Sequence, residues 1–209
     1  AHESRLALTV SISRFFRDRR LWETLRADAF PYWAEKGLNR VRVWSAGCAR
    51  GEEAYSMMMI REKARRDGLS FPDIEVTASD INPVYLDAAQ QGVYSSSSVK
   101  EISMPDREAF FDVRKGGRQF RVKPFLKTGV RWQLLDLAGP LPERKFDLIF
   151  LRNNILTYLD EDSRTAVFRR VVARIRPGGF IIKGAHETLP RIETAFVRAF
   201  DHPHVWQLV

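Results

Sequence analysis

The stretch that most constrains the fold is residues 41–55, VRVWSAGCARGEEAY, in which a short apolar strand leads through a glycine-containing loop into a helix. Gly47 and Gly51 allow the main chain to turn tightly and to approach a ligand without an intervening Cβ. In open parallel sheets such ligands lie beyond the carboxyl ends of the strands. Glu52 and Glu53 in the first helical turn would repel a pyrophosphate, so the loop predicts a ligand that carries a cation.

The remainder of the chain alternates strand-like apolar runs with helical segments. Pro83 lies in the first turn of the helix that follows the second strand, and Gly92 lies just past its end. This alternation implies parallel pairing with right-handed crossovers, and so predicts an α/β fold with a doubly wound, mostly parallel sheet. The predicted strands cover 41–45, 74–79, 130–135, 146–151 and 180–183, and the predicted helices cover 52–66, 83–91, 106–111 and 161–175.

Length and composition predict one domain over residues 1–209, because 209 residues with 44% hydrophobic and 29% charged side chains can bury one sizeable core. An amphipathic helix over 12–33, ending near Pro31, precedes the first strand and could cover the ligand cleft. The sequence has no apolar run of the roughly 20 residues that a membrane helix needs, and no secretory signal. A single Cys48 excludes an internal disulfide, fits a cytoplasmic protein, and is interpreted as a small residue in a tight turn.

A small basic β insertion is predicted at about 113–129. The glycine pair at 116–117, followed by alternating Phe120 and Val122, is typical of a hairpin. Residues 113–133 carry 7 basic groups and no acidic group, which favours contact with an acidic partner. A nucleic acid is the rival partner, since aromatic side chains alternate with the charges, and a solvated edge protected by charge is the third interpretation.

Polar side chains follow successive strands of the predicted sheet, and strand ends at one edge are neighbours in space. Asp80 after the second strand is suited to accept hydrogen bonds from two ribose hydroxyls, or it caps the next helix. Asp136 after the third strand could receive an adenine amino group, or it caps a loop. These groups are expected to ring one pocket: Glu52, Glu53, Asp80, Asp136, Arg152, Asn153, His186 and Glu187.

Seven motifs distributed over most of the chain resemble the CheR-type methyltransferases, an S-adenosylmethionine-dependent family that methylates glutamate side chains of bacterial chemoreceptors. The resemblance implies a class I methyltransferase-like, Rossmann-like fold, with S-adenosylmethionine as cofactor and an acidic, chemoreceptor-like protein or peptide as substrate. It also implies that the small β insertion can dock a receptor tail. The motifs are RFFRD (14–18), VWSAGCARGEEAYS (43–56), ASDIN (78–82), AAQQGVY (88–94), FDLIFLRN (146–153), TYLD (157–160) and PGGFIIKGAHE (177–187).

The resemblance also implies roles for individual residues. Glu52 would hold the methionine amino end of the cofactor, Asp80 the ribose, and Asp136 with Leu137 the adenine. Arg17 would contact the cofactor and steer the incoming carboxylate. The remaining implied contacts are Ser11 and Ser13, which replace the usual Asn and Thr, Gly47 in the loop, Asn153 at the edge of the site, and Tyr158 near the active-site tyrosine.

Two departures from the family pattern keep other functions open. The segment 152–160 is one residue longer than usual, which could displace Tyr158, and Gly184-Ala185-His186-Glu187 replaces Gly-His-Ser-Glu. If the acceptor were an amine or hydroxyl of a small molecule or RNA, His186 and Glu187 could serve as a base pair. A non-catalytic cofactor-binding module is the third hypothesis. No metal is predicted, because Asp201, His202 and His204 lack a fourth ligand.

Overall fold

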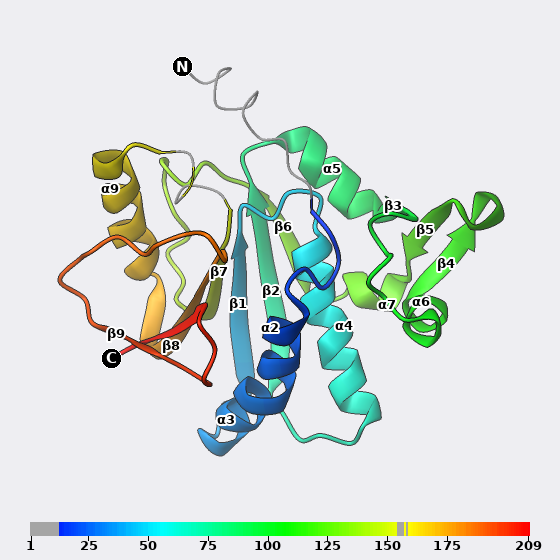
Figure 1. Cartoon of the computed structure of the whole chain (residues 1–209), viewed down its shortest axis with the longest axis horizontal. Coiled ribbons are helices and arrows are strands. Elements are labelled where there is room, and N and C mark those ends of the chain that lie inside the picture. The colour runs from blue at the N-terminus through cyan, green and yellow to red at the C-terminus, as the bar shows by residue number, and fades with distance from the viewer. Residues whose placement is uncertain (1–12, 154–156, 158) are drawn as a thin grey trace.

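The computed structural model describes residues 13–153, 157 and 159–209, which form a seven-stranded sheet and a separate three-stranded sheet. The strands of the large sheet lie in the order β6-β2-β1-β7-β8-β10-β9. The carboxyl ends of its parallel strands lie at the top of Figure 1. β10 runs antiparallel to both of its neighbours. The bounds are β1 Arg40–Ala46, β2 Asp73–Asp80, β6 Val130–Leu134, β7 Phe146–Leu151, β8 Ile175–Lys183, β9 Phe196–Arg198 and β10 Val205–Leu208.

Alternating side chains of the central strands build one apolar cluster on each face of the large sheet. In β1, Val41 and Val43 belong to the cluster that packs beneath α4, whereas Trp44 and Ala46 belong to the cluster that packs against α9. β7 is buried along its whole length because both of its faces are covered. The fold is therefore the Rossmann-like, doubly wound arrangement that the sequence predicted.

Two helices begin and end where the sequence predicted, α4 at Glu52–Arg66 and α5 at Pro83–Gln91. Asn82 caps α5, since its side chain accepts a hydrogen bond from the Val84 N–H at 3.0 Å. Helix α9 spans Glu161–Val172 and is shorter than the predicted 161–175, because Ile175 already begins β8.

The N-terminal helix differs from its prediction over 12–33. It begins only at Arg19, because Phe16 and Asp18 adopt positive φ angles of 52° and 67°, which interrupt a right-handed helix. Pro31 does not end it. A π-helical turn precedes the proline, which then lies in the first turn of a further helix, where its missing N–H is tolerated. The segments are α2 Arg19–Thr24, the π turn η1 Leu25–Ala29 and α3 Phe30–Glu35.

Four strands of the large sheet differ from the prediction. β6 forms the edge of the sheet rather than part of its core, and most of its side chains are exposed. β8 begins before the Pro-Gly-Gly sequence at 177–179, which forms a bulge opposite β7 instead of a separate turn. The antiparallel strands β9 and β10 were not predicted.

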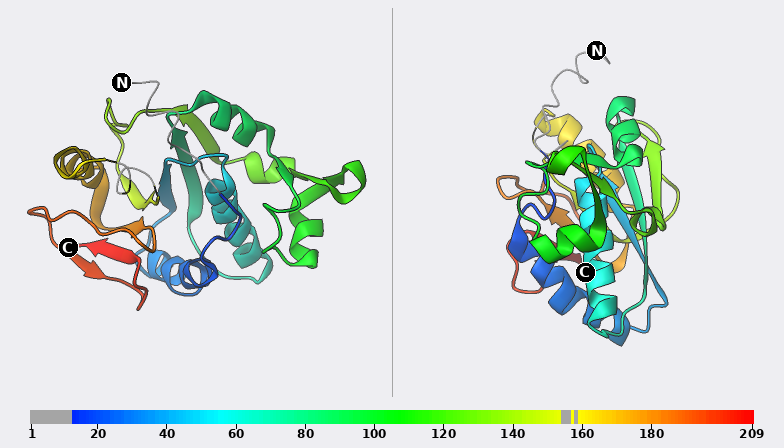
Figure 2. Two further views of the ribbon diagram at one scale, coloured as in Figure 1. Left: turned by 45° about the horizontal axis from the view of Figure 1, so that its top comes forward. Right: turned by 90° about the vertical axis from the view of Figure 1, so that its right-hand side faces the viewer.

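The smaller sheet confirms the predicted β insertion and its hairpin at 116–117. It also contains a third strand, β3, which was not predicted and which pairs with β5. Its order is β3-β5-β4, and Figure 2 shows it projecting from one side of the molecule. Phe111 packs edge-on against Phe15, which also meets Tyr94, so the sheet is joined to the N-terminal segment. The elements are β3 Val93–Ser95, α6 Met104–Phe110, β4 Phe111–Arg114, η2 Lys115–Gly117, β5 Gln119–Val122 and α7 Pro124–Lys127.

Across the described ranges, every helix is too short or too polar to traverse a bilayer.

Candidate functional site

A pocket lies where β1 and β7 end, beneath the segment that precedes α2. Its walls come from four parts of the chain: the N-terminal segment with α2, the glycine loop after β1, the start of α4 and the residues that follow β7. The lining residues are Ser13, Arg14, Arg17, Trp22, Gly47, Cys48, Ala49, Glu53, Arg152 and Asn153. This is the edge of the sheet at which the sequence predicted a ligand.

Four of the predicted site residues line this pocket together: Ser13, Arg17, Gly47 and Asn153. Four others lie outside its lining, namely Glu52, Asp80, Asp136 and Leu137. The remaining two, Ser11 and Tyr158, fall outside the described residues. Arg14, Cys48, Glu53 and Arg152 line the pocket but were not among the contacts that the resemblance implied.

Glu52 is a buried carboxylate with one unsatisfied oxygen. The residue is 2% exposed, and its Oε2 has no hydrogen-bond partner among the described residues. Burial raises the pKa of Glu52, while hydrogen bonds from its own backbone and from the Ser13 side chain oppose that rise. A buried anionic oxygen without a donor favours a ligand that brings a cationic donor to it.

Glu53, the next residue, is held by the protein itself. The Ser45 hydroxyl donates to its Oε1 at 2.6 Å, and the Arg152 guanidinium lies 3.5 Å from its Oε2. Burial raises the pKa of Glu53, and the charge of Arg152 opposes that rise. Arg152 also lies 3.8 Å from Asp18, so one arginine bridges the N-terminal segment and α4 across the pocket.

Two residues with strained backbone conformations line the pocket, and carboxylate side chains accept hydrogen bonds from their N–H groups. Ala49 and Asn153 have positive φ angles of 48° and 53°. The Ala49 N–H donates to Asp80 Oδ2 at 2.8 Å, and the Asn153 N–H donates to Glu187 Oε2 at 2.9 Å. Such conformations persist only where the surroundings fix them, and they concentrate at functional sites. Asp80 and Glu187 thus fix the shape of the two loops that line the pocket.

Asp80 does not cap α5, because Asn82 does so. Its second oxygen accepts the Asn82 N–H at 2.9 Å, and the residue is 8% exposed. A carboxylate has about four acceptor positions, so two backbone bonds leave capacity for ribose hydroxyls.

The two residues predicted at the adenine lie on the third loop. The Asp136 carboxylate accepts the Ala138 N–H at 2.8 Å, which is the loop-capping role weighed from the sequence. The Leu137 side chain packs in the apolar cluster beneath α9, so this residue would offer a ligand its backbone only.

The alternative base pair does not form. Glu187 is buried and accepts three hydrogen bonds, from the N–H groups of Asn153 and Gly184 and from the Thr157 hydroxyl. His186 is exposed. Burial and the neighbouring acids raise the pKa of the Cys48 thiol well above its ordinary value, which fits a turn residue and not a thiolate nucleophile.

Comparison with known proteins assigns the chain to a family. Residues 11–203 match the model of the CheR methyltransferase, SAM binding domain. The chain belongs to this family. It is 31% identical over 182 residues to a chemotaxis protein methyltransferase of Listeria monocytogenes, covering 87% of this chain and 67% of that protein. It is 30% identical over 204 residues to chemotaxis protein methyltransferase 1 of Vibrio cholerae, covering 95% and 72%.

Among solved structures, an amino pentose methyltransferase from Micromonospora echinaspora with S-adenosylmethionine bound has a TM-score of 0.45 and 16% identity, over 85% of this chain and 58% of that one. The family match makes this CheR-family chain an S-adenosylmethionine-dependent methyltransferase. The described residues fit that cofactor, since Glu52 offers a buried oxygen without a donor to the cationic amino group that S-adenosylmethionine carries.

Proposed function

We propose that this protein methylates a glutamate carboxyl group on an acidic segment of a chemoreceptor-like protein. The observation that carries the proposal is the pocket lining, in which the exposed Arg14 and Arg17 lie beside the glycine loop while none of the described lining residues is a histidine. Cations suit an acceptor that arrives as an anion, and such an acceptor needs no base.

The chemistry balances without a proton transfer. When bound, S-adenosylmethionine would supply an electrophilic methyl group on a sulfonium. A carboxylate oxygen of the substrate forms the new bond to that carbon, the carbon–sulfur bond breaks, and its electron pair stays on sulfur. The products are a neutral methyl ester and S-adenosylhomocysteine. The protein therefore has to orient the carboxylate and keep water away, and orientation alone can contribute roughly 7–11 kcal/mol to lowering the barrier.

The proposed roles follow from the positions of the residues. Glu52 would accept hydrogen bonds from the amino group of the cofactor, and Asp80 would hold its ribose while keeping the glycine loop in shape. The exposed Arg17, at the pocket wall, would steer the substrate carboxylate. Ser11, Ser13, Gly47, Asp136, Leu137, Asn153 and Tyr158 remain predicted contacts of the cofactor or the acceptor.

An acidic partner fits the charge of the smaller sheet. The hairpin between β4 and β5 exposes Arg114, Lys115 and Arg118, and Arg121 is exposed on β5. Together with the implication that this insertion docks a receptor tail, these charges support an acidic peptide as the substrate-bearing partner. Amine or hydroxyl methylation is not favoured, because Glu187 is engaged in three hydrogen bonds.

The test uses cofactor labelled in its methyl group and a chemoreceptor cytoplasmic fragment. We expect protein-bound label that mild alkali releases as methanol, and no label when the acceptor glutamates are replaced by alanine. Arg17→Ala should raise KM for the receptor fragment more than Arg17→Lys does, because lysine keeps the charge. His186→Ala is the matched control and should leave the rate unchanged. An alkali-stable label, or a larger loss from His186→Ala than from Arg17→Ala, would contradict ester formation.

A further inference from the structure

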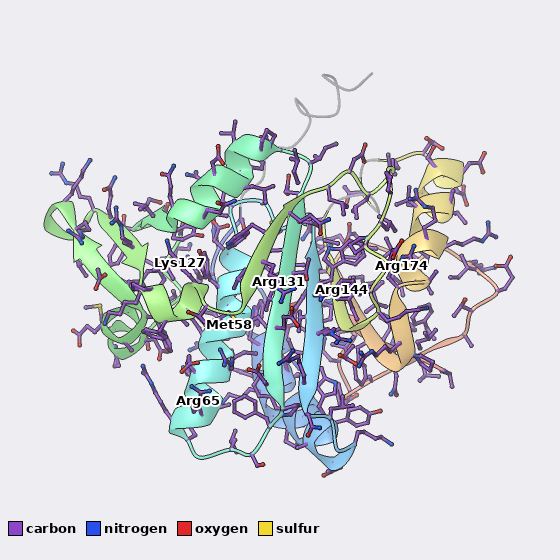
Figure 3. The ribbon with its side chains drawn as sticks, turned by 180° about the vertical axis from the view of Figure 1, so that it is seen from behind. Met58, Arg65, Lys127, Arg131, Arg144 and Arg174 are labelled. Carbon is purple, nitrogen blue, oxygen red and sulfur yellow. The ribbon has the colours of Figure 1, made fainter. Side chains whose placement is uncertain are left out.

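The rear face of the large sheet is open to solvent near the amino ends of its strands. The connection from β6 to β7, residues 135–145, contains no helix, and Arg144 near its end reaches the amino-terminal part of β2 on this face. Figure 3 views this face, with the three strands foremost and Arg131 and Arg144 beside them. Apolar side chains could not remain on such a surface at low cost, and the strands carry charged residues there instead.

Three arginines from different elements converge on one glutamate on this face. Arg131 Nη2 and Arg144 Nη1 lie 3.0 and 3.1 Å from the same oxygen, Oε1 of Glu75, and Arg40 Nη1 lies 4.0 Å from the other oxygen. The Glu75 side chain is 11% exposed, whereas that of Arg131 is 66% exposed. We call Arg40, Arg131 and Arg144 around Glu75 the rear arginine cluster.

The cluster holds more positive charge than Glu75 can neutralise. Three guanidinium groups and one carboxylate leave two positive charges. Asp73 offsets part of the charge on Arg40, since it lies 3.8 Å from Arg40 and 3.1 Å from Arg61, and Arg61 also lies 3.6 Å from Glu62. Arg131 and Arg144 share one oxygen of Glu75, so an excess of positive charge remains. Guanidinium groups held this close repel one another. The Arg40 and Arg131 side chains are 56% and 66% exposed, so they can bind carboxylates in pairs of parallel hydrogen bonds.

We infer that the rear arginine cluster is a second docking surface, which binds an acidic protein segment carrying at least two carboxylates. The excess positive charge is spread over three guanidinium groups, so it suits a segment with more than one carboxylate. A nucleic acid is less suited, because the aromatic residue of β6, Trp132, turns to the opposite face and packs against Tyr55, with ring centroids 5.4 Å apart. The cluster lies at the amino ends of the strands, away from the pocket at their carboxyl ends, so it would anchor a partner and not present the reacting group.

The cluster also divides the basic segment 113–133 that was read from the sequence as one surface. The hairpin residues of that segment belong to the smaller sheet, while Arg131 lies on the rear face of the large one. An acidic partner long enough to meet both surfaces would gain affinity through the raised effective concentration of its second segment.

Binding of a fluorescein-labelled oligoglutamate to the full chain, followed by anisotropy at low salt, tests the inference without any methyl transfer. Arg131→Glu should weaken binding by about tenfold, because it removes one exposed cation and repels the peptide. Arg65→Glu is the matched control: its side chain is 64% exposed on α4, it changes the net charge equally, and it should change affinity less than about twofold. Both arginines are labelled in Figure 3.

Two further variants separate loss of the arginine's charge from added repulsion, and binding at the rear arginine cluster from binding at the hairpin. Arg131→Gln removes the charge without adding repulsion beside Glu75, and it should weaken oligoglutamate binding by a smaller factor while leaving S-adenosylmethionine affinity unchanged. Arg118→Glu reports on peptide bound at the hairpin. The inference would be overturned if Arg131→Glu and Arg65→Glu lowered the affinity for oligoglutamate equally, or if only Arg118→Glu lowered it. It would also be overturned if oligothymidylate bound more tightly than oligoglutamate and did so through Arg131. None of these outcomes bears on the methyl acceptor.

Discussion

The two ends of the large sheet pair arginine with carboxylate in opposite ratios. At the pocket, Arg152 lies between Glu53 and Asp18, and its side chain is 7% exposed. On the rear face, three arginines surround Glu75, and the Arg131 side chain is 66% exposed. One buried cation shared by two acids fixes the position of the chain segments that carry them. Three cations around one acid, two of them with side chains more than half exposed, leave charge for a partner. Charge ratio and burial together therefore separate an internal support from a docking surface.

The largest effect should come from removing the buried arginine. Arg152→Met leaves Glu53 buried without its countercharge, which we expect to reduce the free energy of unfolding by about 3 kcal/mol. Burial already raises the pKa of Glu53, and losing Arg152 raises it further. A carboxyl group whose folded pKa exceeds its unfolded value of about 4.3 stabilises the fold at low pH, and that contribution is lost as pH rises through the folded pKa. Urea unfolding should therefore show a larger deficit at alkaline than at acidic pH.

The double variant Arg152→Met with Glu53→Gln is the control for this prediction. Replacing the carboxyl with a neutral amide should recover part of the stability and remove the added pH dependence. If the single and double variants were equally unstable, the loss would come from packing of the arginine and not from the uncompensated charge.

The next largest effect concerns the clamp on the glycine loop. Asp80→Ala removes the acceptor for the Ala49 and Asn82 N–H groups as well as the proposed ribose contact. Each charge-assisted hydrogen bond contributes about 1.5–3 kcal/mol, so calorimetry should show S-adenosylmethionine binding weakened by roughly a hundredfold. Asp136→Ala is the comparison variant, since the Asp136 carboxylate caps its own loop at Ala138, and it should cost affinity less. Unchanged affinity in Asp80→Ala would remove the ribose assignment.

Much of the fold could be predicted because its signals are local. The Gly51 turn before α4, and Pro83 and Gly92 around α5, mark helix ends within a few residues. β7 was recognised from a short apolar run that Asp147 alone interrupts. The position of β6 at the sheet edge depends on which strands pair, and the π turn before Pro31 depends on packing of the covering helix, so neither has a local signal.

Some residues that line the pocket could be predicted from the sequence, but the residues that hold them in place could not. The rule that strand ends converge placed the Gly47 loop and Asn153 at one pocket. It could not show that Glu187 holds the Asn153 backbone, because 34 residues separate them, nor that Arg152 reaches Glu53 across 99 residues. For the contact between Glu187 and the Asn153 backbone, the sequence offered only the Gly-x-x-Glu pattern at 184–187 as a signal. For the contact between Arg152 and Glu53 it offered no signal.

A smaller effect should distinguish the two neighbouring acids of α4. Burial raises the pKa of Glu52, and only its ionised form can hold the amino group of the cofactor. S-adenosylmethionine affinity should therefore fall as pH is lowered through that raised pKa. Glu52→Gln should bind about tenfold more weakly at neutral pH and lose this pH dependence. Calorimetry over a pH series measures both. A Glu52→Gln variant with the wild-type pH profile would shift the assignment to another acid.

The smallest effect is expected on the rear face, and it completes the comparison. Arg144→Gln removes one of three cations around Glu75, and two remain to neutralise it. Partly exposed ion pairs contribute about 0–1 kcal/mol and are screened by salt, so urea unfolding should show a loss of less than about 1 kcal/mol that shrinks as salt is added. The loss in Arg152→Met should persist at high salt, because buried pairs are screened far less. If Arg144→Gln destabilised the fold as much as Arg152→Met, the rear arginines would be needed to hold Glu75 in the fold and would not be spare charge.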